Sequence, residues 1–524
     1  MARVDLVFLF LLCFIVYGQA STYTNNNAGL TAVPSNIPIT TVTVNLKENS
    51  LTIITSVDFS LLDKLKNLYL NKNNISSISP NAFDNTPLER LDLSHNPIKT
   101  VPFFPAIDTT LRFLSMLECQ ISNTTWNHIV LYSKLLDLRL NTNQLTTLPN
   151  VTKSAATLRY MDLSTNKIQT FDAADLDGCN ALSWLSVSGN TGFKHINGCL
   201  KLPELASLTL ASDALDQFPN ISCMPNLVWL YIESNEIQHL PKNSFVINQR
   251  LAHLFIGRNR LSQMPDLHGI ENSLQGLRIS HNPNITGLPT DYFSGFSKLL
   301  HIDLTQNSID SVTFAQSFGP SVQHFIMNGN KITDVPAGTF INATGMINMN
   351  FDANQITDFD ISNIQYMPQL GSINLRNNQL TRVKNASTYC RGLSCTTLTI
   401  DLLANPVPCD KYICWAKMNS SIKVTHNGCS GKPWINVTVD DLPCPTEKVM
   451  KLVEKQGFTG TFMNYDLQNY DYKEIQLGSM LFMKCIGTCL RTDGCHYFKH
   501  GNTTGTNAVD HKYTQNCTIW TPGP

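Results

Sequence analysis

Apolar residues recur along most of this chain with a period of 22 to 25 residues, and the period repeats fourteen times in succession. Each unit opens on an apolar residue, places further apolar residues at its fourth and sixth positions, and usually has Asn at its ninth. Alternation at a spacing of two predicts a short strand in each unit, with its apolar side chains turned inward. The units begin at Leu65, Leu88, Leu111, Leu135, Leu158, Leu182, Leu205, Leu227, Leu251, Leu274, Leu299, Val322, Met346 and Leu370.

The ninth-position Asn follows each predicted strand, where the chain must turn. Its side-chain amide both donates and accepts hydrogen bonds, so stacked copies can bond the backbone of neighbouring coils and form a ladder. Two units depart from this pattern, because Cys119 replaces Asn in the third and Asp213 replaces it in the seventh. We expect Cys119 to be a buried, unreactive thiol.

The second halves of three units share a Leu/Val-Pro-x-x-x-Phe motif, whose phenylalanines are Phe245, Phe293 and Phe340. We expect these rings to fill the core on the convex side. Together with the leucine-led strands, the motif resembles the leucine-rich repeats of extracellular animal proteins over about residues 40 to 405. The resemblance implies an α/β-type repeat solenoid, a horseshoe with parallel strands on its concave face. Such a fold hosts many functions and does not identify a ligand.

Changes in composition divide the chain into four parts. We expect a signal peptide at residues 1–20, the solenoid at 21–405, a cysteine-containing cap at 406–445 and a small separate module at 446–524. Residues 21–41 contain no cysteine, so the usual disulfide-bonded N-terminal cap is missing. The N-terminal edge of the sheet then needs a simpler cover or a partner, because a terminal coil exposes core and strand edge.

The first twenty residues have the pattern of a secretory signal. Arg3 precedes an apolar run from Leu6 to Tyr17, and small residues follow up to Ala20. This run is too short to span a bilayer, and no later stretch approaches the length of a membrane span. The sequence therefore predicts a secreted, extracellular protein without a membrane anchor.

Charge and motifs narrow the classes of function. The chain has 38 Lys and Arg residues against 39 Asp and Glu residues, a formal net charge of −1. It lacks the basic footprint typical of nucleic-acid binding. It also lacks the Gly-x-Ser-x-Gly, His-Glu-x-x-His and phosphate-loop motifs of common enzyme classes. We therefore expect a protein without catalysis, cofactor, resident metal or nucleic-acid partner.

Eleven Asn-x-Ser/Thr sequons accompany the predicted secretion and indicate a glycoprotein. The seven sequons within the repeats all follow the predicted strands, so glycans would leave the concave strands open. The predicted glycosylation sites are Asn74, Asn123, Asn150, Asn220, Asn284, Asn342, Asn385, Asn419, Asn436, Asn502 and Asn516.

Four cysteines follow the last repeat, at Cys409, Cys414, Cys429 and Cys444. The segment resembles the C-terminal cap of extracellular leucine-rich-repeat proteins, although four residues separate the first two cysteines where that family commonly has one. The resemblance implies disulfides Cys409–Cys429 and Cys414–Cys444. Zinc is the alternative use of four cysteines, whereas a secretory compartment favours disulfides.

The remaining cysteines of the repeats are expected to be structural. Cys390 and Cys395 are expected to close a small loop in the last full unit. Cys199 and Cys223 lie at nearly the same place in consecutive units and could pair. One of the three cysteines Cys179, Cys199 and Cys223 would then be free.

The tail contains Cys485, Cys489, Cys495 and Cys517, with three and then five residues between the first three. This spacing, followed by aromatic residues, resembles the apple/PAN module. The resemblance implies disulfides Cys485–Cys517 and Cys489–Cys495 in a non-catalytic α+β module that binds proteins or carbohydrates. A small disulfide-rich domain without its own ligand is the alternative.

Side chains at the third and fifth positions of each unit flank the inward leucines and are expected on the concave surface. Aromatic residues gather there in the middle units. Exposed aromatic residues are enriched at binding hot spots, although strands also favour them for cross-strand packing. The candidate ligand-binding residues are Tyr160, Trp184, Trp229, Tyr231, His253, Phe255 and Arg278.

Three histidines, His253, His301 and His324, share the third-position column and could sense pH or hold a metal. Gly276 interrupts the column and no carboxylates accompany the histidines in register, which favours solvated surface histidines.

Together these patterns favour a secreted, glycosylated protein that binds an extracellular protein ligand on its concave face, in adhesion, receptor-type signalling or innate recognition. One alternative is a glycan-binding lectin or agglutinin that acts through the tail, with carbohydrate as its ligand. Another is a non-catalytic subunit that stabilises a secreted enzyme.

Overall fold

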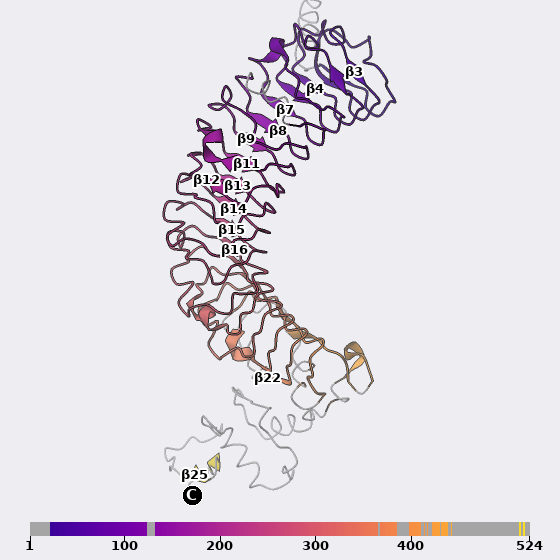
Figure 1. The fold of residues 1–524 in the computed structure, drawn as a ribbon. Coiled ribbons are helices and arrows are strands. Elements are labelled where there is room, and N and C mark those ends of the chain that lie inside the picture. The colour runs from indigo at the N-terminus through magenta and orange to yellow at the C-terminus, as the bar shows by residue number, and fades with distance from the viewer. Residues whose placement is uncertain are drawn as a thin grey trace, which may run out of the picture. The chain divides into compact units, whose positions relative to one another are not determined.

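Figure 1 shows the computed structural model of the chain. The chain forms two compact units, residues 1–282 and 283–524. The predicted signal peptide and most of the predicted tail module lie outside the residues that the structure describes. The described residues are 21–122, 132–364, 367–384, 398–409, 413, 417, 422–429, 431–438, 442, 513–514 and 517–518.

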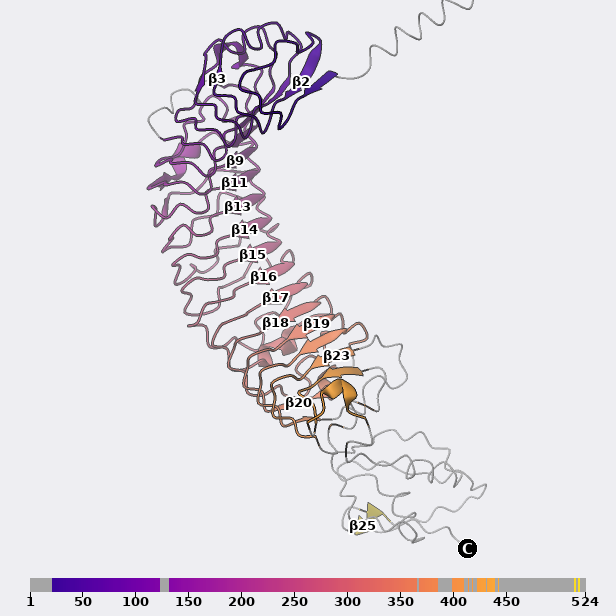
Figure 2. The same cartoon turned by 90° about the vertical axis from the view of Figure 1, so that its right-hand side faces the viewer.

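The N-terminal unit is built on a parallel sheet that gains one short strand per coil. Each strand pairs in parallel with the strand of the next coil, so strands adjacent in the sheet are also consecutive coils of the chain (Figure 2). The strands are β1 (Ser21–Thr24), β2 (Thr41–Asn45), β4 (Asn67–Tyr69), β6 (Arg90–Asp92), β7 (Phe113–Ser115), β8 (Asp137–Arg139), β9 (Tyr160–Asp162), β11 (Trp184–Ser186), β13 (Ser207–Thr209), β14 (Trp229–Tyr231), β15 (His253–Phe255) and β16 (Gly276–Arg278).

The C-terminal unit repeats this arrangement with the strands β17 (His301–Asp303), β18 (His324–Ile326), β19 (Asn348–Asn350), β21 (Ser372–Asn374), β23 (Leu398–Asp401) and β24 (Ile422–Thr425). The last strand, β24, pairs in parallel with β23 and lies within the predicted cap. The sheet therefore continues beyond residue 405, which the repeat pattern did not predict because the cap segment lacks the leucine-led motif.

Short elements occupy the second halves of the coils that the structure describes, where 3-10 helices stand in place of the α-helices of an α/β-type repeat. The parallel pairs are β3 (Ile53–Ile54) with β5 (Ser77–Ile78), β10 (Phe171–Asp172) with β12 (Ile196–Asn197), and β20 (Asp358–Asp360) with β22 (Arg382–Lys384). The 3-10 helices are η1 (Pro105–Ile107), η3 (Ala173–Leu176), η4 (Thr313–Ser317), η5 (Ile361–Ile364) and η8 (Trp434–Asn436). In the tail, β25 (Tyr513–Thr514) and β26 (Cys517–Thr518) pair antiparallel.

The core lies between the two halves of each coil, as the period predicts. The central residue of a typical strand is buried while its two flanking residues are half-exposed, as in β14 around Leu230. Phe245, Phe293 and Phe340 are buried from the other side, so the predicted role of the Leu/Val-Pro-x-x-x-Phe motif is confirmed. Each coil buries its apolar residues against the coils before and after it. The stacked coils are therefore stable together, and a single coil is not stable alone.

The ninth-position asparagines form the predicted ladder. In Asn259, Nδ2 donates to the carbonyl oxygens of Ile256 (3.1 Å) and of Ile232 in the preceding coil (3.0 Å). Its Oδ1 accepts from the backbone amide of Ile237, also in the preceding coil (3.1 Å). Buried backbone groups at the turn, which have no strand partner, are thereby satisfied.

A polar strand, β1, covers the N-terminal edge of the sheet. It pairs with β2, and the chain after it is held by Asn49, whose Oδ1 accepts from the backbone amides of Ala28 (2.9 Å) and Leu30 (3.1 Å). Residues 21–30 thus form a partial coil that continues the ladder without a disulfide. This is the simpler cover that the missing cysteines lead us to expect.

Cys119 and Asp213 both occupy ladder positions and are buried. The Cys119 Sγ lies 3.5 Å from the carbonyl oxygen of Leu93, and burial raises the pKa of this thiol to about 11. The prediction of an unreactive thiol agrees with this setting, because the thiolate is the reactive form.

Asp213 places a titratable group where the ladder normally has an amide. Its Oδ1 accepts from the backbone amide of Asn190 (2.7 Å), as the Asn oxygen does elsewhere in the ladder. Its Oδ2 therefore takes the place of the donating nitrogen, and it has no hydrogen-bond partner among the described residues. Burial raises the pKa of the Asp213 carboxyl to about 8. The neutral acid fits this place, since its O–H can donate where the carboxylate cannot.

Asp213→Asn should remove a pH-dependent loss of stability. In the unfolded chain an aspartate titrates near about 3.9, so the unfolded state releases its proton first and the folded state loses stability as pH rises from about 4 to about 8. We expect the substitution to raise the free energy of unfolding at pH 7 on the order of 4 kcal/mol, and far less at pH 4.

Thermal unfolding followed by circular dichroism between pH 4 and pH 8 measures this effect. The exposed Asp175, replaced by Asn, is the matched control. An equal shift of the Asp213→Asn midpoint at every pH would contradict the assignment.

Candidate binding face of the parallel sheet

Strand register brings the predicted ligand-binding residues of the N-terminal unit together on one face of its sheet. Trp184 pairs with Ser207, Ser207 with Trp229, and Trp229 with His253. The predicted third- and fifth-position columns therefore exist, and their aromatic side chains are half-exposed. We call this surface the aromatic face, formed by Tyr160, Trp184, Trp229, Tyr231, His253 and Phe255, with Arg278 at its edge. Its role in binding stays a prediction.

The rings of the aromatic face stack on one another in two groups. The rings of Tyr160 and Trp184 lie 4.1 Å apart with an angle of 4° between their planes. In the second group, Trp229 stacks on His253 at 3.5 Å and 11°. The rings of Tyr231 and Phe255 lie 4.9 Å apart at 11°. Since neighbouring strands run in register, the two rings of each stacked pair hold the same position in consecutive coils.

Arginine side chains extend both groups. The guanidinium of Arg139 lies over the ring of Tyr160 at 4.7 Å, and Asp137 holds it in place through paired hydrogen bonds of 3.0 Å. At the other end, Arg278 lies over Phe255 at 5.4 Å and 3.7 Å from a carboxylate oxygen of Glu233. Cation–π contacts at such sites contribute about 0.5–1 kcal/mol each.

Two further residues shape the face, and sequence reasoning did not give them that role. Phe113 is nearly buried beneath the guanidinium of Arg90, which lies 3.7 Å from its ring centre. Gly276, interpreted above as a gap, makes room for its neighbour, because a Cβ there would lie 2.8 Å from Nδ1 of His253. The glycine thus permits the imidazole position in which His253 stacks on Trp229.

Stacking makes the aromatic face a rigid surface. Each aromatic pair contributes about 0.5–1.5 kcal/mol beyond its buried area, and the rings restrict one another's rotation. A surface ordered before a ligand arrives loses little side-chain entropy on binding.

The other two histidines of the column belong to the C-terminal unit. The rings of His301 and His324 stack at 4.1 Å and 19°. Burial and the proximity of His324 lower the pKa of His301. Among the described residues, the one group of three or more candidate metal ligands lies elsewhere.

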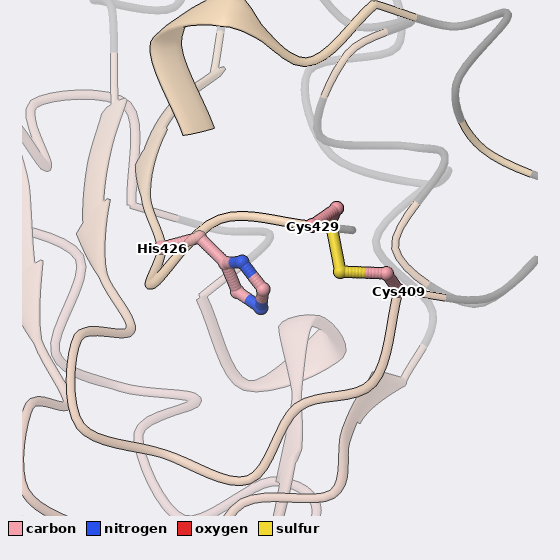
Figure 3. A group of neighbouring side chains, drawn as sticks. All are labelled: Cys409, His426 and Cys429. Carbon is pink, nitrogen blue, oxygen red and sulfur yellow. A yellow bond between two sulfur atoms is a disulfide. The ribbon is translucent and has the colours of Figure 1, made fainter. Parts of the chain in front are cut away.

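That group consists of Cys409, His426 and Cys429 (Figure 3). Its two sulfur atoms form a disulfide. Nε2 of His426 lies 3.1 Å from the carbonyl oxygen of Val407, and Nδ1 accepts from the backbone amide of Gly428 (3.2 Å). Every candidate ligand atom is therefore occupied within the protein. The arrangement is that of a cross-link packed beside a hydrogen-bonded histidine.

Of the predicted disulfides, Cys409–Cys429 is present. A second disulfide joins Cys199 and Cys223 of consecutive coils, and it leaves Cys179 as a buried free thiol whose pKa burial raises to about 11. The partners of the remaining predicted pairs lie wholly or partly outside the described residues: Cys390, Cys395, Cys414, Cys444, Cys485, Cys489, Cys495 and Cys517.

The predicted glycosylation sites that the structure describes are exposed, and they lie outside the strands of the parallel sheets. These sites are Asn74, Asn150, Asn220, Asn284, Asn342 and Asn436. The predicted sites outside the described residues are Asn123, Asn385, Asn419, Asn502 and Asn516. Within the described residues, no helix has the length and apolar character needed to cross a membrane.

Comparison with known proteins finds similarity in the repeats. A family model described as leucine rich repeat matches residues 40–102, 133–191 and 225–283. These segments are similar to leucine-rich repeats. Lumican from Gallus gallus is 26% identical over 371 residues, which cover 68% of this chain and 92% of that protein. The similarity extends through most of the repeat region.

Solved structures share the fold. Toll, in the Toll–Spatzle complex of Drosophila, is 18% identical with a TM-score of 0.56 over 78% of this chain and 56% of that chain. A plant peptide hormone receptor in complex with RGF2 is 21% identical with a TM-score of 0.50 over 78% of this chain and 64% of that chain. Similarity at this level shows the parallel-strand solenoid alone.

Removal of the Cys409–Cys429 cross-link should destabilise the C-terminal unit. The bond closes a loop with a sequence separation of 20, and the chain-entropy model gives about 3 kcal/mol for loops of this length. Replacing both cysteines by Ser should therefore lower the free energy of unfolding by about 3 kcal/mol in urea.

The Cys199→Ser/Cys223→Ser variant is the matched control, because its loop of 24 residues lies in the other unit. A loss of structure on chelation of metal from the wild-type protein, rather than on reduction, would contradict the cross-link assignment.

Proposed function

We propose that this chain is a secreted, glycosylated, non-catalytic protein that binds an extracellular protein ligand through the aromatic face, on the side of the solenoid predicted to be concave. The observation that carries the proposal is the stacked array on neighbouring strands. Half-exposed tryptophan and tyrosine rings, held rigid, are the residues that dominate protein interfaces.

The chemistry of the face favours a protein over a small molecule. It is an open surface several strands wide, with apolar rings at its centre and the charged groups of Arg139, Asp137 and Arg278 around them. An apolar centre with a charged rim is the usual arrangement of a protein interface. Among proteins with this fold, Toll is seen in complex with Spatzle and a plant receptor in complex with RGF2, which supports recognition of proteins or peptides.

Secretion and glycosylation rest on separate features. The apolar run from Leu6 to Tyr17 supports export. The exposed sequons outside the sheets support glycans that leave the aromatic face open, and the two disulfides suit an oxidising compartment. A matrix, receptor-type or defence role is consistent with each of these features.

Trp229→Ala should weaken ligand binding by more than about 2 kcal/mol, the threshold of a hot spot, because it removes the ring on which His253 stacks. The measurement is capture of partners from the native extracellular fluid by the secreted full-length chain, followed by titration of the captured partner. Phe255→Ala should give a similar loss.

Ile326, at a half-exposed fifth position in the C-terminal unit, provides the matched control when changed to Ala. A folded Trp229→Ala protein with unaltered affinity would place the ligand elsewhere on the molecule.

A further inference from the structure

The two groups of stacked rings are separated by a single strand, β13. At its third position this strand has Ser207, where the neighbouring strands have Trp184 (β11) and Trp229 (β14). Its fifth position is Thr209. Register places Ser207 directly between the two tryptophans. The stack therefore lacks one ring, and the missing position is above Ser207.

The uncovered faces of the two indoles point toward this position. Trp184 is covered on its β9 side by Tyr160, at 4.1 Å and 4°. Trp229 is covered on its β15 side by His253, at 3.5 Å and 11°. Since β9 and β15 lie on opposite sides of β13, the remaining face of each indole is directed across β13 toward the other.

The width of this opening suits one planar group. Rings on neighbouring strands are separated by 3.5 to 4.9 Å in these stacks. Trp184 and Trp229 stand on strands two spacings apart, which is about 9–10 Å at about 4.8 Å per strand. A flat cation midway would lie about 5 Å from each indole, within the range of cation–π contacts.

The charges around the opening favour a cation. From β9 to β15, the third and fifth positions carry one formal charge, that of Asp162. The guanidinium groups of Arg139 and Arg278 lie at the two ends of this stretch, over Tyr160 and Phe255. An indole attracts a cation over its ring more strongly than any other aromatic side chain, and here two indoles would do so at once.

The protein already stacks guanidinium groups in the same array. Arg90 lies over Phe113 at 3.7 Å, and Arg139 lies between the rings of Phe113 (5.1 Å) and Tyr160 (4.7 Å). A guanidinium between two aromatic rings is therefore an arrangement that this sheet geometry supports within its own chain.

We propose that the slot formed by Trp184, Ser207 and Trp229 receives the guanidinium of an arginine side chain of the protein ligand. The inference rests on the proposed function and names the group that the aromatic face recognises. The two indole faces enclose the planar cation, while the Ser207 hydroxyl beneath it can accept one of its N–H groups.

The test titrates N-acetyl-arginine amide into the full-length secreted protein and follows tryptophan fluorescence and saturation-transfer NMR. The matched probes are N-acetyl-citrulline amide, which is planar but neutral, and N-acetyl-lysine amide, which is charged but not planar. We expect the arginine probe to bind at least about tenfold more tightly than either. Equal binding of the three probes, or tighter binding of N-acetyl-tryptophan amide, would overturn the assignment.

Ser207→Trp should fill the slot and abolish arginine binding, whereas Ser372→Trp, at the half-exposed third position of β21, should leave it within about twofold. The strand position accepts tryptophan, since Trp184 and Trp229 occupy the same position of their coils, and an unchanged melting curve verifies folding. Ser207→Tyr is the second filling variant. Retained arginine binding in folded Ser207→Trp and Ser207→Tyr proteins excludes the slot.

Partner capture separates this inference from the proposed function. If Trp229→Ala loses the captured partner while Ser207→Trp keeps it, the aromatic face binds the ligand but the slot does not receive it. If both variants keep the partner, both proposals fail. Loss of the partner in both variants, with retention in Ser372→Trp, supports both.

Discussion

Every coil of this protein depends on the next coil for the hydrogen bonds that it cannot make alone. A strand of three residues is too short to be stable by itself, and the turn that follows it leaves buried backbone groups without partners. Parallel pairing satisfies the backbone groups of the strand, and the asparagine ladder satisfies those of the turn. Asn259, for example, bonds the carbonyl of Ile232 and the amide of Ile237. The 22-to-25-residue period exists because each coil must return to the same register.

That register also determines the chemistry of the aromatic face. Residues far apart in sequence become neighbours because they hold the same position in consecutive coils, as Trp229 and His253 do. Along each column of the face, consecutive side chains are therefore one strand spacing apart. This spacing is close to the distance between the centres of stacked aromatic rings, once the rings tilt toward each other. A small residue in one coil, such as Ser207, then leaves an opening one ring wide.

The period allowed the strands, the inward leucines and the surface columns to be predicted from sequence, because these depend only on positions within a repeat. A cover of the N-terminal edge was expected, but its form as the strand β1 and the extension of the sheet by β24 could not be predicted, since neither segment has the leucine-led motif. The contribution of Gly276 was also hidden. Its value lies in the absence of a Cβ that would touch His253, and a sequence does not show which neighbour needs that space.

The coil that carries Ser207 on its strand is also the coil that carries Asp213 in the ladder. Its surface lacks a stacked ring, and its turn has a carboxyl in place of the amide. Oδ1 of Asp213 still accepts from Asn190 in the preceding coil, but Oδ2 has no hydrogen-bond partner among the described residues. β13 thus lacks two side-chain contacts that other coils make, while strand pairing and the apolar core still join it to its neighbours. A planar group held between Trp184 and Trp229 would bridge the strands on either side of this coil. A ligand group in the slot would then supply the stacking contact that Ser207 does not make. Ligand binding would thereby stabilise this part of the sheet.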